Sequence, residues 1–412
     1  MGLVQSEKSQ QEIAAKDYVY DIFKYRENMS IECPVRDGLV SDWDALEKLW
    51  EHALSTYCGR EGGNLNETPV LLAEKPYAPI SSRHRMCEMM FEKYSAPAVF
   101  LSKDAVLAAY ACGKTSGLVI DIGASGSVVT PVQDGWVETK GICRTQAGGR
   151  LIDAHIRSNV LSQKYGQLRP AYRLNRIAAA TEPFGVLVSE KQNLGNVHPS
   201  FNAFMNLECA RDVKESLAKA ADSTLLEADP RYFSIPVTPY ELPDGTLIEV
   251  NIERFQMAEV LFDPTPMQNS NASMDLYALY AHNNNTASNV PPSTVSASAG
   301  PLDSVPKVVG DAVLRSDVDM QSMLLSNMML TGGCACIDGL SERLKSEVER
   351  LIYQGGAAGY RTRMVSVGVS ERALCPWLGG SIVASLGSFH EVWVTRQEYD
   401  ECGTTIIDRK CP

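Results

Sequence analysis

The carboxy-terminal segment, residues 377–412, restricts the possible folds of this chain more than any other stretch. Gly379 and Gly380 predict a turn, and the small residues that follow predict a helix that ends near Leu386. An aromatic, strand-like step at Trp393 and a charged tail come next. Small side chains let neighbouring backbones approach closely, which is typical of helices that pack on sheets. The segment therefore predicts a helix that packs closely on a sheet.

Length and composition predict a protein of more than one lobe. The chain has 412 residues, whereas a single hydrophobic core stops growing at about 250–300 residues. It contains no run of about 18 apolar residues, so we expect no membrane span. Eleven cysteines without CxxC spacing are typical of reduced thiols. The net charge of −12 argues against direct, sequence-specific DNA binding, because neutralising phosphates takes clustered Lys and Arg.

Apolar periodicity predicts helices and strands in alternation. Between Gly38 and Leu54 apolar residues recur at helical spacing, and Ser41 or Asp42 is placed to cap a helix. Residues 1–24 are polar and are expected to be irregular, with at most a short helix around 10–23. The other expected elements are a strand at 70–74, a helix at 83–94 with the basic cluster 83–85 on a solvated face, a strand and a helix after Pro97, and a strand at 117–123 followed by a hairpin at Asp134-Gly135.

The string WVTRQEYDE, from Trp393 to Glu401, resembles the carboxy-terminal signature of the actin family. The last four residues, RKCP, resemble the ending of the nuclear actin-related proteins of type 4, whereas conventional actins end in Phe. Further segments with this resemblance, in the same order, are GLVSDWDALEKLW, YSAPAVFLSKDAVLAAY, YELPDGTLIEV, ERFQMAEVLFDP and LTGGCACIDGLSERL. The resemblance covers residues 25–412 and implies the α/β, actin-like (ribonuclease H-like) ATPase fold, with two lobes of mixed sheets flanked by helices.

The resemblance also implies a division into actin-like subdomains. Residues 25–111 with 375–412 resemble subdomain 1, 112–147 with 263–374 resemble subdomain 3, and 148–262 resemble subdomain 4, while 1–24 form an irregular amino-terminal segment. Two insertions interrupt the match. The first, at about 164–207, has a mixed pattern that allows helices of its own. The second, at 267–306, is rich in Asn, Ser and Pro and predicts a disordered surface loop.

The family's first phosphate-binding hairpin, which precedes the segment matched at Tyr25, has no counterpart in residues 1–24. We therefore expect the first lobe to be incomplete. Two explanations are open. Either Met1 is not the start of the natural product, which we favour, or the chain is a shortened variant that relies on a partner strand.

The resemblance implies a site for ATP or ADP with Mg²⁺. In this fold glycine loops cradle the phosphates with backbone N–H groups, and an aspartate holds the waters around the metal. Asp121 corresponds to that aspartate. Lys214 and Glu215 correspond to the pair that contacts base and ribose, although a surface pair on a helix is an alternative. The loop residues that the resemblance implies are Gly123, Ser125, Gly126, Gly148, Gly332 and Gly333.

Several positions depart from the family's catalytic pattern. Ala124 stands where a second acidic residue is expected, Val128 where a histidine orients the attacking water, and Asp104 where a glutamine does so. A carboxylate at 104 would repel the γ-phosphate. Near the base, Ile337 and Ala373 replace a tyrosine and a lysine. The resemblance therefore implies weakened nucleotide binding and no enzymatic activity.

The family resemblance implies a non-catalytic scaffold in the nucleus, within chromatin-remodelling and histone-acetyltransferase complexes; a cytoplasmic location is the alternative. Such subunits pair with actin on a helix of a Swi2/Snf2-type motor or scaffold subunit. The resemblance also allows histones as a partner, and it implies no contact with a membrane. Trp377 and Trp393 would lie near the cleft that receives partner helices, with core packing as the alternative for both. The rival functions are a cytoskeletal actin-like ATP-binding protein and a sugar kinase, but we find no catalytic aspartate in the glycine context that a sugar kinase needs.

Overall fold

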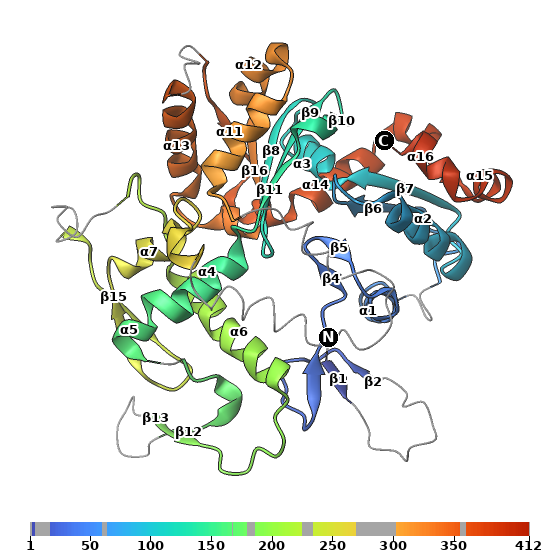
Figure 1. Cartoon of the computed structure of the whole chain (residues 1–412). Coiled ribbons are helices and arrows are strands. Elements are labelled where there is room, and N and C mark those ends of the chain that lie inside the picture. Colours follow the sequence, from blue (N-terminus) through green and yellow to red (C-terminus); the bar gives the residue numbers. More distant parts are fainter. Residues whose placement is uncertain are drawn as a thin grey trace. The chain divides into compact units, whose positions relative to one another are not determined.

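The structure, a computed structural model, describes residues 2–4, 17–59, 64–166, 168–178, 186–224, 234–268, 302–354 and 360–411 (Figure 1). Its contacts divide the chain into two compact units. Unit 1 comprises Met1–Pro34, Arg150–Asn289 and Ile337–Gly339, and unit 2 comprises Val35–Gly149, Val290–Cys336 and Leu340–Pro412. Most of the predicted surface loop, 269–301, lies outside the described residues. Within the described ranges no helix is long and apolar enough to cross a membrane.

The larger sheet of unit 2 has six strands and is built around β8 (Gly117–Ile122). β8 pairs in parallel with β16 (Met328–Thr331) and antiparallel with β9 (Ser127–Gln133). All three strands are largely buried, which their apolar sequences explain. The remaining strands are β10 (Trp136–Val137), β11 (Cys143–Thr145) and β17 (Met364–Val365). The helices α11 (Val305–Arg315) and α12 (Val318–Ser326) pack on the sheet, and α13 (Leu340–Gln354) packs against α11.

The smaller sheet of unit 2 has three strands in the order β18-β7-β6. Its buried centre is β7 (Ala98–Lys103), flanked by β6 (Val70–Glu74) and β18 (Val394–Thr395). The helix predicted at 83–94 is present as α2 (Ile80–Glu88), which continues as a π-helical turn over Met89–Lys93. Other elements of this part are α1 (Trp43–Tyr57), α15 (Arg396–Cys402), α16 (Ile406–Lys410) and the hairpin of β4 (Val35–Arg36) and β5 (Leu39–Val40).

Two local predictions are confirmed in unit 2. Asp42 caps α1, where its carboxylate accepts a hydrogen bond from the Ala45 N–H at 3.0 Å. Asp134 and Gly135 join β9 to β10 with positive φ angles of 49° and 84°, which is the backbone of a type I′ hairpin turn. Both features depend on residues close together in the sequence, so a local pattern was sufficient to find them.

The predicted turn at Gly379 and Gly380 was wrong. Both residues lie inside α14 (Cys375–Ala384), which packs on α3 (Asp104–Ala111). A Cβ on Gly379 would lie 1.8 Å from the backbone oxygen of Leu107, so only glycine allows this approach. The glycine pair therefore serves a close helix–helix contact and does not break the chain direction.

The carboxy-terminal tail is part of the core of unit 2. The Tyr399 ring stacks on Phe91 with 4.6 Å between centroids, and Cys411 is fully buried. Arg83 contacts this tail, because its guanidinium donates to the Cys411 carbonyl and pairs with Asp408. Only 10% of the Arg83 side chain is exposed, so the predicted solvated face was wrong for this residue, whereas His84 bonds to Asp408 with 27% of its side chain exposed.

Unit 1 begins with a three-stranded antiparallel sheet of β1 (Gly2–Val4), β2 (Asp17–Val19) and β3 (Met29–Ile31). The prediction of an irregular segment over 1–24 was wrong for β1 and β2, while 5–16 lie outside the described residues. Residues 25–34 belong to this unit, which differs from their predicted place with 35–111: the Ile31 N–H, for example, donates to Ser200 Oγ at 2.9 Å.

The rest of unit 1 surrounds the long helix α6 (Pro199–Leu217). Met29, Tyr172 and Phe201 form a small apolar core on it. The predicted insertion at 164–207 contains a β-hairpin and the first half of α6. The other elements are α4 (Gly149–His155), its π-helical continuation Ile156–Val160, α5 (Ser162–Tyr165), α7 (Glu253–Glu259), α8 (Thr265–Gln268), and the hairpins of β12 (Leu174–Ala178) with β13 (Val186–Glu190) and β14 (Thr238–Glu241) with β15 (Leu247–Val250).

Candidate functional site

Glycine loops from separate parts of unit 2 meet where β8 ends. The loop from β8 to β9 is closed by a hydrogen bond from the Gly123 N–H to the Gly126 carbonyl at 3.0 Å. The Gly123 carbonyl accepts a second bond, at 2.9 Å, from the N–H of Gly149. A Cβ on Gly148 would lie 2.6 Å from the Gly126 nitrogen. The predicted residues Gly123, Gly126 and Gly148 are therefore in direct contact, with Ser125 in the same loop.

The third predicted glycine loop follows β16 and adjoins Asp121. In the parallel pairing of β8 and β16, Thr331 lies opposite Asp121. Gly332 comes next with a φ of +99°, and a Cβ there would lie 2.5 Å from Asp121 Oδ1. Gly333 then begins a short 3₁₀ turn, Gly333–Cys336. Asp121 and Gly332, which the family resemblance grouped in one site, therefore lie in contact distance of each other.

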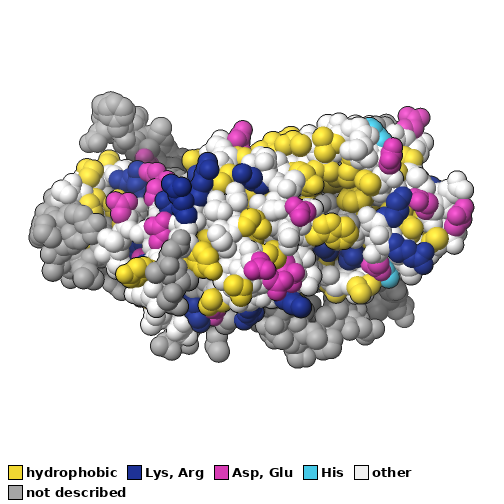
Figure 2. All heavy atoms as spheres, turned by 90° about the horizontal axis from the view of Figure 1, so that it is seen from above, with side chains coloured by type: hydrophobic (Ala, Val, Ile, Leu, Met, Phe, Trp, Pro, Cys, Tyr) yellow, Lys and Arg dark blue, Asp and Glu magenta, His cyan; other side chains and the backbone are white. Residues whose placement is uncertain are grey.

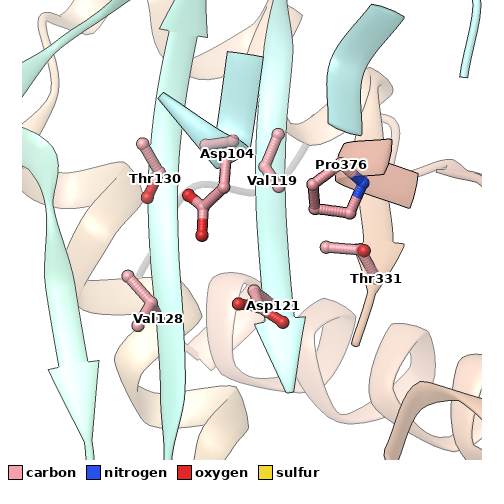
Figure 3. Close-up of a pocket in the computed structure, with 8 residues that line it drawn as sticks. Asp104, Val119, Asp121, Val128, Thr130, Thr331 and Pro376 are labelled. Carbon is pink, nitrogen blue, oxygen red and sulfur yellow. The ribbon is translucent and has the colours of Figure 1, made fainter. Parts of the chain in front are cut away.

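Two carboxylates share a pocket on one face of this sheet, which the starts of α3 and α14 also line. Figure 3 shows Asp104 and Asp121 in that pocket, with Val128 and Thr130 of β9 on one side and Thr331 and Pro376 on the other. Val128 is directly opposite Asp121 in the β8–β9 register. The position where the family resemblance expects a histidine to orient water therefore presents an apolar side chain to the carboxylates.

Lys75, which was not among the predicted site residues, pairs with both carboxylates. Its Nζ lies 2.7 Å from Asp104 Oδ2 and 2.7 Å from Asp121 Oδ2. Burial lowers the pKa of Lys75, but the charges of the two aspartates outweigh burial and raise this pKa well above its usual value. Burial also raises the pKa of Asp104, which Lys75 opposes. The one available signal was a lysine directly after a strand that runs parallel to the strand before Asp104.

Lys214 and Glu215 belong to unit 1 and lie on α6. The Lys214 ammonium is 2.7 Å from Asp153 Oδ1, and both side chains are largely buried. Burial raises the pKa of Asp153 to about 6, although Lys214 opposes the shift. Glu215 is 61% exposed and pairs with Arg211 at 2.8 Å. The alternative of a surface pair therefore holds for Glu215 and was wrong for Lys214.

The two tryptophans suggested as partner contacts have different surroundings. Trp377 lies on α14 and is 69% exposed. Trp393 packs against the core of unit 2, with its ring 5.1 Å from that of Phe389. Core packing, the alternative interpretation for both, therefore describes Trp393 but not Trp377.

The comparison with protein families decides the identity of the fold. The model of the Actin family matches residues 1–412. The chain belongs to the actin family. Membership confirms the α/β, actin-like fold that the carboxy-terminal string predicted.

Among curated proteins, this actin-family chain is similar to Actin-related protein 4 of Oryza sativa and of Arabidopsis thaliana. The identities are 35% and 33%, over 94% of this chain and 80% and 81% of those proteins. It is also 30% identical to a Schizosaccharomyces pombe protein named as subunit arp42 of the SWI/SNF and RSC complexes, over 93% of this chain and 86% of that protein. The predicted likeness to actin-related proteins of type 4 is thereby confirmed.

Proposed function

We propose that this protein is a non-catalytic, nuclear subunit of a chromatin-remodelling complex, where it acts as a scaffold and not as an ATPase. The name of the Schizosaccharomyces pombe relative supports the assembly, and histone-acetyltransferase complexes are a second assembly of the same kind. The observation that carries the non-catalytic part is the contact of Lys75 with both Asp104 and Asp121.

Hydrolysis of a γ-phosphate needs a positioned water and a cation that offsets the developing charge. Asp104, at the position expected to orient the water, is paired with Lys75. Val128, at the other expected position, has no proton acceptor, and Ala124 in the neighbouring loop is exposed and apolar. The N–H groups of Gly123 and Gly332 donate to the Gly126 and Arg372 carbonyls, so we propose that any binding of ATP or ADP at these loops is weak and structural.

The exposed face of α14 supports a partner helix as ligand. The opposite face of this helix, with Gly379 and Val383, is buried. On the outer face, Trp377 and Ile382 are at least 46% exposed, and Leu374 and Leu386, just before and after the helix, are at least 45% exposed. Exposed apolar side chains on and beside one helix suit a partner helix that docks through apolar anchors. We propose a helix of the Swi2/Snf2-type motor or scaffold subunit at this face, with actin as the neighbouring subunit and histones as a further contact.

The surface charge gives no support to direct DNA binding. On the face drawn in Figure 2, Lys and Arg side chains are interspersed with Asp and Glu among the described residues, without one extended basic stripe. The net charge of −12 also disfavours contact with phosphate. We therefore propose that contact with chromatin is made through protein partners.

A measurement of ATP turnover tests the proposal that the protein is not an ATPase. Purified protein should release γ-phosphate at the background rate, and the double substitution Ala124→Asp with Val128→His should not restore activity, because Lys75 remains on both carboxylates. Turnover comparable to that of conventional actin would refute the scaffold proposal.

Affinity purification from nuclear extract tests the partners. The wild type should recover actin and a Swi2/Snf2-type motor, and Trp377→Ala should lose the motor while it keeps the fold. Leu314→Ala is the matched control, because Leu314 is an apolar residue of α11 that is 73% exposed. Recovery of cytoskeletal partners alone would favour an actin-like cytoskeletal role instead.

A further inference from the structure

Lys75 lies where three segments of unit 2 meet. It directly follows β6, and the parallel register of β6 with β7 brings it beside Asp104 at the start of α3. Asp121 reaches the same ammonium from β8, in the other sheet of the unit. With both Nζ–Oδ2 distances at 2.7 Å, one ammonium bridges two carboxylates. The contact thereby ties the two sheets of unit 2 together.

The stem of Lys75 is enclosed by the turn of the β4–β5 hairpin. A Cβ on Gly38 would lie 3.0 Å from Lys75 Cγ and 2.6 Å from the Tyr77 hydroxyl. That hydroxyl donates to the Asp37 carbonyl at 2.8 Å. The Arg144 guanidinium lies 3.8 Å from the centroid of the Tyr77 ring. Lys75 is therefore held along its length, and 26% of its side chain is exposed.

We propose that Lys75 is a built-in counter-ion that takes the place of a divalent cation between Asp104 and Asp121, so that this pair of carboxylates does not bind Mg²⁺. Mg²⁺ requires near-octahedral oxygen ligands and keeps several waters. An ammonium on the same carboxylate oxygens takes up that space and repels the ion. Within the described parts of the chain, no group of three His, Cys, Asp or Glu side chains is arranged to hold a metal. Because the Lys75 ammonium lies on both carboxylates, the residues at this site do not fit the Mg²⁺ that the actin fold implies.

This proposal has a consequence for stability that does not depend on the chromatin assignment. A contact supplied by Mg²⁺ would be removed by a chelator, whereas one supplied by Lys75 is not. The unfolding temperature of the full-length chain should therefore be the same in Mg²⁺ and in EDTA. A failed search for nuclear partners would leave this expectation unchanged.

The decisive variant is Lys75→Gln, which removes the ammonium and leaves both carboxylates in place. Titration of the full-length chain with Mn²⁺, followed by electron paramagnetic resonance, should show no specific site in the wild type. The variant should bind Mn²⁺ about tenfold more tightly or better, because the repelling charge is gone. Its lowered unfolding temperature should rise again when Mg²⁺ is added.

Lys103→Gln is the matched control. Lys103 is the last residue of β7, its side chain is only 11% exposed, and its ammonium pairs with Glu74 at 2.6 Å. This variant should lose stability without gaining a Mn²⁺ site. The proposal is overturned if Lys75→Gln gains no site, or if Lys103→Gln gains the same one. If Lys75→Gln does not fold, the Mn²⁺ titration of the wild type is compared with that of Asp121→Asn. Stoichiometric binding by the wild type that is lost in Asp121→Asn would overturn the proposal. Identical Mn²⁺ titrations of the two proteins would support it.

Discussion

Substitution of Gly379 by alanine tests the close contact of α14 with α3. The added Cβ would lie 1.8 Å from the Leu107 oxygen and 2.5 Å from its carbonyl carbon. Real Cβ atoms do not approach another heavy atom within 3.0 Å, and the obstacle is backbone inside a buried helix. A side-chain rotation cannot relieve the clash, so α14 has to move away from α3.

The expected cost follows from this geometry. Overpacking a core costs about 1–3 kcal/mol, and a backbone obstacle puts this site at the upper end of that range. The higher helix propensity of alanine relative to glycine stabilises the folded state by about 1 kcal/mol and offsets part of this cost. The net loss of stability should therefore be about 2 kcal/mol, which lowers the unfolding temperature of a unit of this size by about 4–8 °C.

The neighbouring glycine supplies the control. A Cβ on Gly380 would lie 3.4 Å from Leu71 Cδ2 and 3.7 Å from Leu107 Cδ1, which are ordinary contacts. Gly380→Ala should therefore keep or slightly raise the unfolding temperature, measured for both variants by calorimetry on the full-length chain. If the two variants shift the temperature equally, or if Gly379→Ala is neutral, the argument for a glycine-dependent contact fails.

Three further predictions concern pH, a hydrogen bond and a helix cap. The pKa of Asp153 is raised from 3.8 to about 6, so its contribution to stability is full below about pH 4 and is lost as the pH rises through about 6. Asp153→Asn should therefore remove this fall in the free energy of unfolding with pH, measured by urea unfolding at a series of pH values. An unchanged pH dependence in the variant would contradict the assignment. Tyr399→Phe keeps the ring stack but removes the 2.7 Å bond to Glu92, so it should cost about 2 kcal/mol in chemical denaturation, and a neutral result would exclude that bond. Thr395→Ala removes the capping box of α15 and should cost about 1 kcal/mol, whereas Thr395→Ser should restore most of the loss.

Structural features formed by residues close together in the chain could be predicted from the sequence. Asp42 lies three residues before the N–H that it caps, and Asp134-Gly135 has the residue types of a type I′ turn, to which Thr115 and Ser116 add hydrogen bonds. The loop glycines were assigned by the family resemblance, and in the structure Gly123 and Gly332 come directly after the apolar strands β8 and β16. In a mixed sheet with parallel neighbours, such strand ends meet at one edge, so the candidate site was largely predictable at the level of the backbone.

Contacts between distant residues could not be predicted in the same way. Lys75 and Asp121 are 46 positions apart, and no periodicity links them. Gly379 has the sequence signature of a turn, and only the position of Leu107 on another helix shows why glycine is needed. The sequence around Arg83 is typical of a solvated helix face, but in the structure Arg83 contacts Cys411 and Asp408 of the carboxy-terminal tail. In each case the deciding partner is brought close by the tertiary fold.

The carboxy-terminal signature owes its specificity to packing. Thr395 and Glu398 form the capping box of α15, and the Lys410 ammonium donates to the Trp393 carbonyl at 2.6 Å and to Glu398 at 2.9 Å. Tyr399 fills the space over Phe91. A segment whose side chains are used in this way identifies a fold, but it says little about ligands or partners. The proposed function must therefore rest on groups outside the signature: the Lys75 ammonium between two carboxylates, and the exposed face of α14.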